Sequence, residues 1–223
     1  MKNLIYILTF VVTATAISQN TIALEKQQLK QALVYGDKAV ATATMYRIIS
    51  LEGPQSTYKD SLAYLYFDSR NYVSCFLVTN DILKNKPNNI ELLEIQAISL
   101  ESMGAIQKAS ESYNTLLSKT NNNYHAYKLA GLQLALKKFE EAYVSVKKAN
   151  QLADAGTINV TFQVNKNYNQ NINLKAAIAY LEGVIALNLK KTDEAKLSFS
   201  RAIELFPDFV LAKGKLESLE TKE

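Results

Sequence analysis

The sequence predicts an all-α protein built from repeated helical hairpins, and three observations support this prediction. The chain has only 7 glycines and 3 prolines among 223 residues, too few turn-forming residues for a many-stranded sandwich or barrel. Asparagine-rich junctions recur every 34 residues, a spacing typical of repeat proteins. Within each repeat, apolar residues are spaced three and four apart, which places them on one face of an α-helix.

Composition and charge exclude several classes of function. Hydrophobic residues at 48% and charged residues at 21% indicate a folded chain with a solvated surface. A single histidine and a single cysteine exclude a Cys/His zinc site and an internal disulfide. The net charge of +4 comes from dispersed lysines and arginines interleaved with acids, so we expect no nucleic-acid partner.

Residues 1–18 predict a secretory signal peptide. A start that contains one lysine is followed by the uncharged run Leu4–Val12, and then by small residues that end in Ala16-Ile17-Ser18. We expect cleavage after Ser18, with cleavage after Ala16 as the alternative; an uncleaved amphipathic N-terminal helix is the other interpretation. The apolar run is too short to span a membrane, and no cysteine follows it for a lipid anchor. The sequence therefore predicts an exported protein, periplasmic or secreted, with no membrane insertion after cleavage.

The repeats occupy most of the remaining chain. They are predicted at residues 22–55, 56–89, 90–123, 124–156 and 176–209. The second helix of each repeat begins with a small residue, which allows the two helices of a hairpin to approach closely. In the second repeat that residue is Cys75, which we predict to be a small buried residue of a helix–helix contact. A nucleophilic cysteine would need a neighbouring base, and the only histidine lies in another repeat.

This pattern resembles the tetratricopeptide repeat (TPR) family. The last repeat carries its small, alanine, aromatic and proline positions at Gly183, Ala195, Phe199, Ala202 and Pro207. The resemblance implies a right-handed α-solenoid of about five hairpins over residues 19–223, closed by a capping helix over 210–222.

Residues 157–175 interrupt the repeats. Apolar Ile158, Val160, Phe162 and Val164 alternate with polar residues, which favours an extended strand. Two interpretations remain open for this insert. It is either a surface loop or short β-ribbon packed on the solenoid, or an edge that binds or dimerises.

Sequence motifs for catalysis are absent. The chain contains no glycine-rich phosphate loop and no Gly-x-Ser-x-Gly elbow, and its one histidine has no thiol nearby in the sequence. We therefore expect a protein that is not an enzyme and has no catalytic residues, metal or cofactor.

The family resemblance also implies a concave groove lined by the first helix of each repeat. The positions that face it carry the candidate binding residues Lys26, Lys30, Asp60, Tyr64, Phe67, Glu91, Glu94, Ile98, Glu101, His125, Lys128 and Tyr180. The alternative is that these residues form an ordinary solvated helix face. The charges depart from the carboxylate-clamp subtype, so we reject a chaperone tail as the ligand.

The sequence thus predicts an exported interaction scaffold or adaptor that binds a peptide or protein segment in its groove, within a bacterial envelope assembly. The alternative is a structural oligomerisation module that joins copies of the chain through the 157–175 insert or through terminal helix faces.

Overall fold

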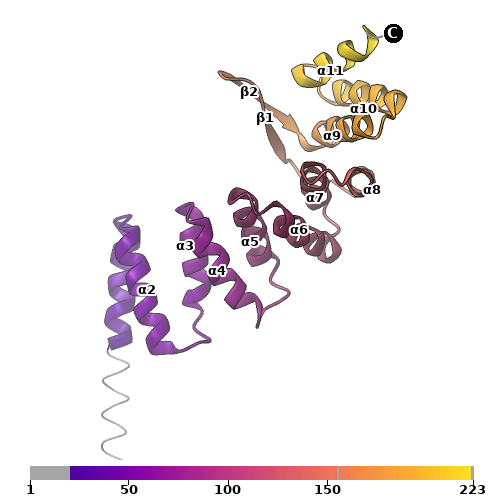
Figure 1. The fold of residues 1–223 in the computed structure, drawn as a ribbon. Coiled ribbons are helices and arrows are strands. Elements are labelled where there is room, and N and C mark those ends of the chain that lie inside the picture. The colour runs from indigo at the N-terminus through magenta and orange to yellow at the C-terminus, as the bar shows by residue number, and fades with distance from the viewer. Residues whose placement is uncertain (1–20, 155, 222–223) are drawn as a thin grey trace, which may run out of the picture. The chain divides into compact units, whose positions relative to one another are not determined.

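The computed structural model describes residues 21–154 and 156–221, so the predicted signal peptide lies outside the described residues. The chain forms two compact units, one ending at Met103 and the other beginning at Gly104, and each is described by itself. Apart from one two-stranded sheet, the regular structure of the described residues is helical (Figure 1). No helix in this part of the chain is long and apolar enough to cross a membrane.

Unit 1 consists of adjacent helices, three of which start at a polar cap. It comprises a helix over residues 21–34, α2 (Lys38–Glu52), α3 (Tyr58–Asp68), α4 (Tyr72–Leu83) and α5 (Ile90–Ser102). Asp37, Asn71 and Asn89 each accept a hydrogen bond from a backbone N–H in the first turn of the following helix. Asn89 at a repeat junction, and Asp37 and Asn71 between the two helices of a repeat, therefore act as helix caps, which satisfy otherwise unpaired N–H groups.

The core of unit 1 is formed by the small and apolar stripes predicted from the repeat. Ala41 and Ile48 of α2 are fully buried and pack with Leu29 and Leu62 of the neighbouring helices. Cys75 is also fully buried, and burial raises the pKa of its thiol. The prediction that Cys75 is a core residue is confirmed.

Unit 2 contains the remaining helices and the insert. Its elements are α6 (Ile106–Thr120), α7 (Asn123–Ala135), α8 (Phe139–Gln151), β1 (Asn159–Asn165), β2 (Tyr168–Asn173), α9 (Leu174–Asn188), α10 (Thr192–Leu205) and α11 (Val210–Glu220). Consecutive helices pack against each other, and α7 also contacts α9. The C-terminal helix α11 covers α10, and its Leu216 and Leu219 pack against the core around Phe199.

The helix pair α9–α10 shows why the repeat needs a small residue. A Cβ atom added at Gly183 would lie 2.6 Å from the ring of Phe199, closer than real Cβ contacts come. Phe199 is fully buried at this point. The close approach of the two helices therefore depends on glycine at this position.

The insert forms an antiparallel ribbon, β1–β2, that is fixed to the helices behind it. Phe162 pairs with Gln170 in the register of the two strands. The side chain of Gln170 donates to the carbonyl of Asp208 (2.7 Å) and accepts from the backbone N–H of Val210 (3.0 Å). Strand β2 is thereby attached to the start of α11.

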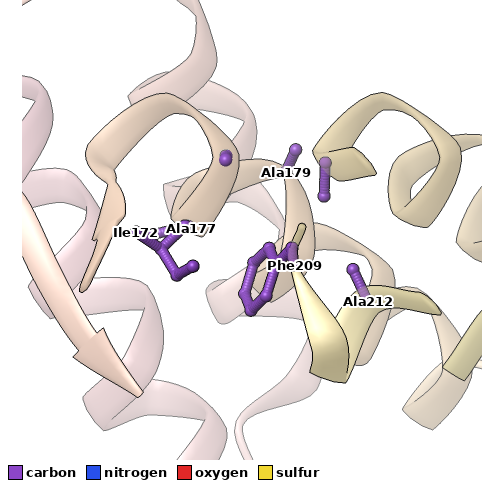
Figure 2. Packing of buried hydrophobic residues seen from close by; sticks show 7 residues of the cluster. Ile172, Ala177, Ala179, Phe209 and Ala212 are labelled. Atoms are coloured by element: carbon purple, nitrogen blue, oxygen red, sulfur yellow. The ribbon is translucent and has the colours of Figure 1, made fainter. Parts of the chain in front are cut away.

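An apolar core lies between the ribbon and the last three helices. Figure 2 shows Ile172 of β2 near Ala177 of α9, with the ring of Phe209 beside them and Ala212 beyond it. All four residues are fully buried. The predicted all-α repeat fold with a β-ribbon insert is confirmed, and the alternation in residues 158–164 correctly indicated a strand.

Candidate functional site

The candidate groove residues lie on first helices of the repeats, in both units. Those of unit 1 lie on the helix over residues 21–34 and on helices α3 and α5. Helices α3 and α5 contact each other. Those of unit 2 lie on α7 and α9.

Tyr64 lies at the centre of an acidic surface in unit 1. Its side chain is 39% exposed, and its hydroxyl donates a hydrogen bond to Oε2 of Glu91 on α5 (2.8 Å). The pKa of Tyr64 is raised to about 12, first by desolvation, then by the bond to Glu91, and further by the charges of Asp60 and Glu94. These three carboxylates are called the acid cluster below.

The direct contacts of Asp60 and Glu91 in the acid cluster differ. Lys86, from the loop before α5, contacts Asp60 at 2.8 Å. Glu91 accepts from the phenol of Tyr64 instead, and no ion pair of Glu91 is found in the described part of the chain. Glu91 thus places a carboxylate without an ion pair beside a half-exposed aromatic ring, an arrangement that favours a cationic ligand.

A second feature of unit 1 is an open pocket of about 470 Å³. It is lined by Lys26, Leu29, Lys30, Leu33, Val34 and Tyr58. Lys26 forms an ion pair with Glu52 (2.9 Å), which is the main reason that its pKa is raised, and its ammonium lies 5.4 Å from the centre of the Tyr58 ring. Leu33 and Val34 are 51% and 73% exposed, so the pocket offers apolar surface beside two lysines.

The other candidates in unit 1 are less available. Phe67 packs against the core that contains Cys75. Its ring and the ring of Tyr72 form an edge-to-face pair with 6.3 Å between the ring centres. Ile98 and Glu101 are half-buried on α5. The structure therefore groups Asp60, Tyr64, Glu91 and Glu94 at one surface, and Lys26 with Lys30 at another, and it places Phe67 in packing.

His125 was expected in the groove, but its side chain is 2% exposed. Its Nδ1 lies 2.8 Å from the hydroxyl of Thr120 at the end of α6, and the rings of Tyr113 and Tyr124 pack on it. Because these neighbours enclose the imidazole, it offers no surface to a partner. Lys128, one turn further along α7, is half-buried with its ammonium 5.8 Å from the centre of the Tyr113 ring.

Tyr180 also differs from its expected place on an open groove. The ring of Phe162 in β1 packs edge-to-face with the ring of Tyr180, with 5.5 Å between the ring centres. The ring centres of Phe209 and Phe199 lie 5.0 Å and 5.7 Å from the centre of the Tyr180 ring. Burial raises the pKa of Tyr180. The groove-facing side of α9 is therefore covered by the chain's own ribbon.

Sequence reasoning missed Glu182, which is 3% exposed inside α9. Its carboxylate binds Lys147 (2.5 Å) and Asn150 (2.5 Å) of α8 and Arg201 (2.6 Å) of α10. Three successive helices are thus joined through one carboxylate. The available signal was an acidic residue inside an otherwise apolar helix, since a buried charge requires partners.

The comparisons with known proteins bear on the fold. No protein-family model matches the sequence, and no curated protein matches it at a significant level. Among solved structures, YrrB, described as "a TPR protein with an unusual peptide-binding site", aligns with a TM-score of 0.68 at 14% identity, over 92% of this chain and 97% of that chain. MamA aligns with a TM-score of 0.63 at 12% identity, over 83% of this chain and 92% of that chain.

A further MamA structure, from Desulfovibrio magneticus RS-1, aligns with a TM-score of 0.61 at 13% identity, over 85% of this chain and 97% of that chain. At identities this low, the likeness shows the fold alone. The fold that it shows is the fold of tetratricopeptide repeat proteins, as the sequence pattern predicted.

Proposed function

We propose that the chain is a non-enzymatic interaction scaffold whose unit 1 binds a peptide segment that carries basic and apolar side chains. The observation that carries this proposal is the acid cluster around Tyr64. The fold is shared with YrrB, which is described as having a peptide-binding site, and this likeness supports a peptide as the kind of ligand.

The acid cluster and the phenol ring suit one kind of side chain. A lysine or arginine placed over the Tyr64 ring would meet the ring face and the carboxylates of Glu91 and Glu94 together. Cation–π contacts at exposed sites contribute about 0.5–1 kcal/mol, and charge complementarity adds specificity and association rate. A basic side chain is therefore the anchor that this surface selects.

The open pocket in unit 1 supplies the apolar part of the site. Leu33, Val34 and Tyr58 offer apolar surface in a pocket of about 470 Å³. Aromatic and apolar anchors in pockets dominate many interfaces. In unit 2 the corresponding face of α9 is filled by Phe162, so we assign peptide binding to unit 1.

A selection from displayed random peptides tests this function. We expect enrichment of peptides that combine Lys or Arg with large apolar residues. The variant E91K/E94K should weaken their binding at least tenfold, because it reverses two charges at the anchor, while far-UV circular dichroism stays unchanged.

The matched control is E140K/E141K, which makes the same charge change at the exposed start of α8 in unit 2. This control should bind the selected peptides as the unchanged chain does. Enrichment of acidic peptides, or equal binding by both variants, would contradict the proposal.

Export to the periplasm or the medium, within an envelope assembly, is part of the same proposal. It is supported by the charged, apolar and small-residue segments of residues 1–18. N-terminal sequencing of the protein isolated from its host should find Gln19 as the first residue, or Ile17 for the alternative cleavage. A chain that still begins with Met1 would rule out cleavage.

A further inference from the structure

The β1–β2 ribbon has an edge that no other described segment covers. The sheet in the described part of unit 2 has two strands, so each strand has one unpaired side. The backbone N–H of Leu174 donates to the carbonyl of Ile158 (2.9 Å). Because hydrogen-bonded pairs alternate along an antiparallel ladder, Asn159, Thr161 and Gln163 direct their backbone groups away from β2.

The side chains of the two strands differ in their attachments to the rest of the unit. Strand β2 is attached to the segment before α11 through Gln170, and Asn173 donates to the carbonyl of Leu205 (3.1 Å). On β1, the described residues make no hydrogen bond to the outward backbone groups of Asn159, Thr161 and Gln163. The side chains of these three residues are exposed.

Strand β1 also lacks the features that prevent edge pairing. It reads Asn-Val-Thr-Phe-Gln-Val-Asn, with neither a charge nor a proline. Edge strands in soluble proteins usually carry lysine, proline or a covering segment, because an open edge templates another strand. The absence of these features on β1 favours a strand partner.

The sequence of β1 identifies that partner as another β1. When two copies pair antiparallel about Phe162, Val160 lies opposite Val164. The β1–β2 ladder shifts register between Gln163 and Asn165, so Asn165 lies outside the regular pairing. Thr161 then lies opposite Gln163, so exposed polar residues meet polar residues and half-buried valines meet valines. This register also uses the outward backbone groups of Thr161 and Gln163 for its hydrogen bonds, as the alternation along β1 requires.

We propose that β1 pairs with β1 of a second copy of this chain, so that two ribbons form one four-stranded antiparallel sheet with a two-fold axis at Phe162. Such an interface is self-complementary, as a two-fold dimer demands. Each Phe162 keeps its packing against Tyr180 on its own α9 and against Phe209, the residue before its own α11. The interface lies in unit 2 and does not depend on the peptide site proposed in unit 1.

Two variants with substitutions at the same positions test the register. In T161K/Q163K, each lysine faces a lysine of the other copy, and like charges directly opposite each other destabilise a sheet. In T161K/Q163E, each lysine faces a glutamate of the other copy. We expect T161K/Q163K to raise the dimer dissociation constant at least tenfold and T161K/Q163E to keep the dimer.

Sedimentation velocity over a range of protein concentrations provides the measurement, with far-UV circular dichroism to establish folding. The dimer of T161K/Q163E should weaken as salt is added, more than that of the unchanged chain, because its new ion pairs are screened. The control N114K/S118K places two lysines on exposed positions of α6 and should leave the dissociation constant within about twofold, since α6 lies outside the proposed interface.

A chain that stays monomeric at high concentration would overturn the proposal and leave the β1 edge to a different partner. Equal dissociation constants for T161K/Q163K and T161K/Q163E would also overturn it, because the partner strand would then not lie in this register.

Discussion

The first-helix faces of the two units carry tyrosines in opposite environments. Tyr64 on α3 is 39% exposed and surrounded by carboxylates. Tyr180 on α9 is packed among Phe162, Phe199 and Phe209. The repeat pattern assigns both residues to the same groove, yet the ribbon converts one of the two faces into core. An insert can therefore decide whether a repeat face stays open to a partner or packs internally.

The units also use charge differently. In unit 1, ion pairs such as Lys38 with Asp68 lie on the surface, where solvent and salt screen them. In unit 2, Glu182 is buried and holds α8, α9 and α10 together through Lys147 and Arg201. Surface charges in unit 1 remain available to a ligand, whereas the carboxylate of Glu182 is occupied in packing.

The largest expected effect comes from removing the ring that covers α9. Phe162→Ala should lower the free energy of unfolding by about 2 kcal/mol, below the range for fully buried phenylalanines because Phe162 is half-buried. Tyr64→Ala should cost less than about 1 kcal/mol, since its ring is partly exposed. Urea denaturation followed by circular dichroism, at concentrations where the chain is monomeric, provides the measurement. If both variants lost the same free energy of unfolding, the ring of Phe162 would contribute no more to stability than the exposed ring of Tyr64.

A smaller effect should distinguish two glycines within helices of unit 2. Gly183→Ala should destabilise the chain by about 1–2 kcal/mol, because the added methyl group meets the buried ring of Phe199. Gly131→Ala should stabilise it by up to about 1 kcal/mol, since nothing lies near its Cβ position and alanine favours helix. Thermal unfolding of the two variants provides the measurement. A stabilising Gly183→Ala would show that α9 and α10 can separate at no cost.

The smallest effect concerns the protonation of Tyr64. Its pKa is raised from 10.0 to about 12 in the folded chain, so the native state holds the proton more tightly than the unfolded state does. The resulting contribution to stability is complete below pH 10 and is lost as the pH rises through 12.

Two variants check this alkaline titration by NMR of labelled tyrosine and by unfolding at several pH values. Glu91→Gln should lower the pKa of Tyr64, because it removes the carboxylate that accepts the phenol proton. Tyr64→Phe should lose less stability than the unchanged chain between pH 10 and pH 12. If the pKa of Tyr64 were unchanged in Glu91→Gln, the carboxylate of Glu91 would not contribute to the raised pKa.

Much of the fold and part of the candidate site could be predicted from the sequence. The spacing of small and apolar residues placed Ala41, Cys75 and Phe199 in the core, and the alternation of Val160 and Phe162 predicted a strand. Both depend on local periodicity, which the sequence carries directly. The grouping of Asp60, Glu91 and Glu94 around Tyr64 followed the repeat register, because equivalent positions of adjacent helices lie side by side.

Periodicity by itself determined that this chain forms helical hairpins interrupted by a ribbon, since every hairpin repeats the same local packing. Only the tertiary structure decided that His125 is enclosed, that Tyr180 is covered by Phe162, and that Glu182 has partners from two other helices. These outcomes depend on contacts between residues distant in sequence, such as those from β1 to α9 and from α8 to α9. Spacing along one helix predicts which face a residue occupies, but the segment that packs against that face is set by the fold.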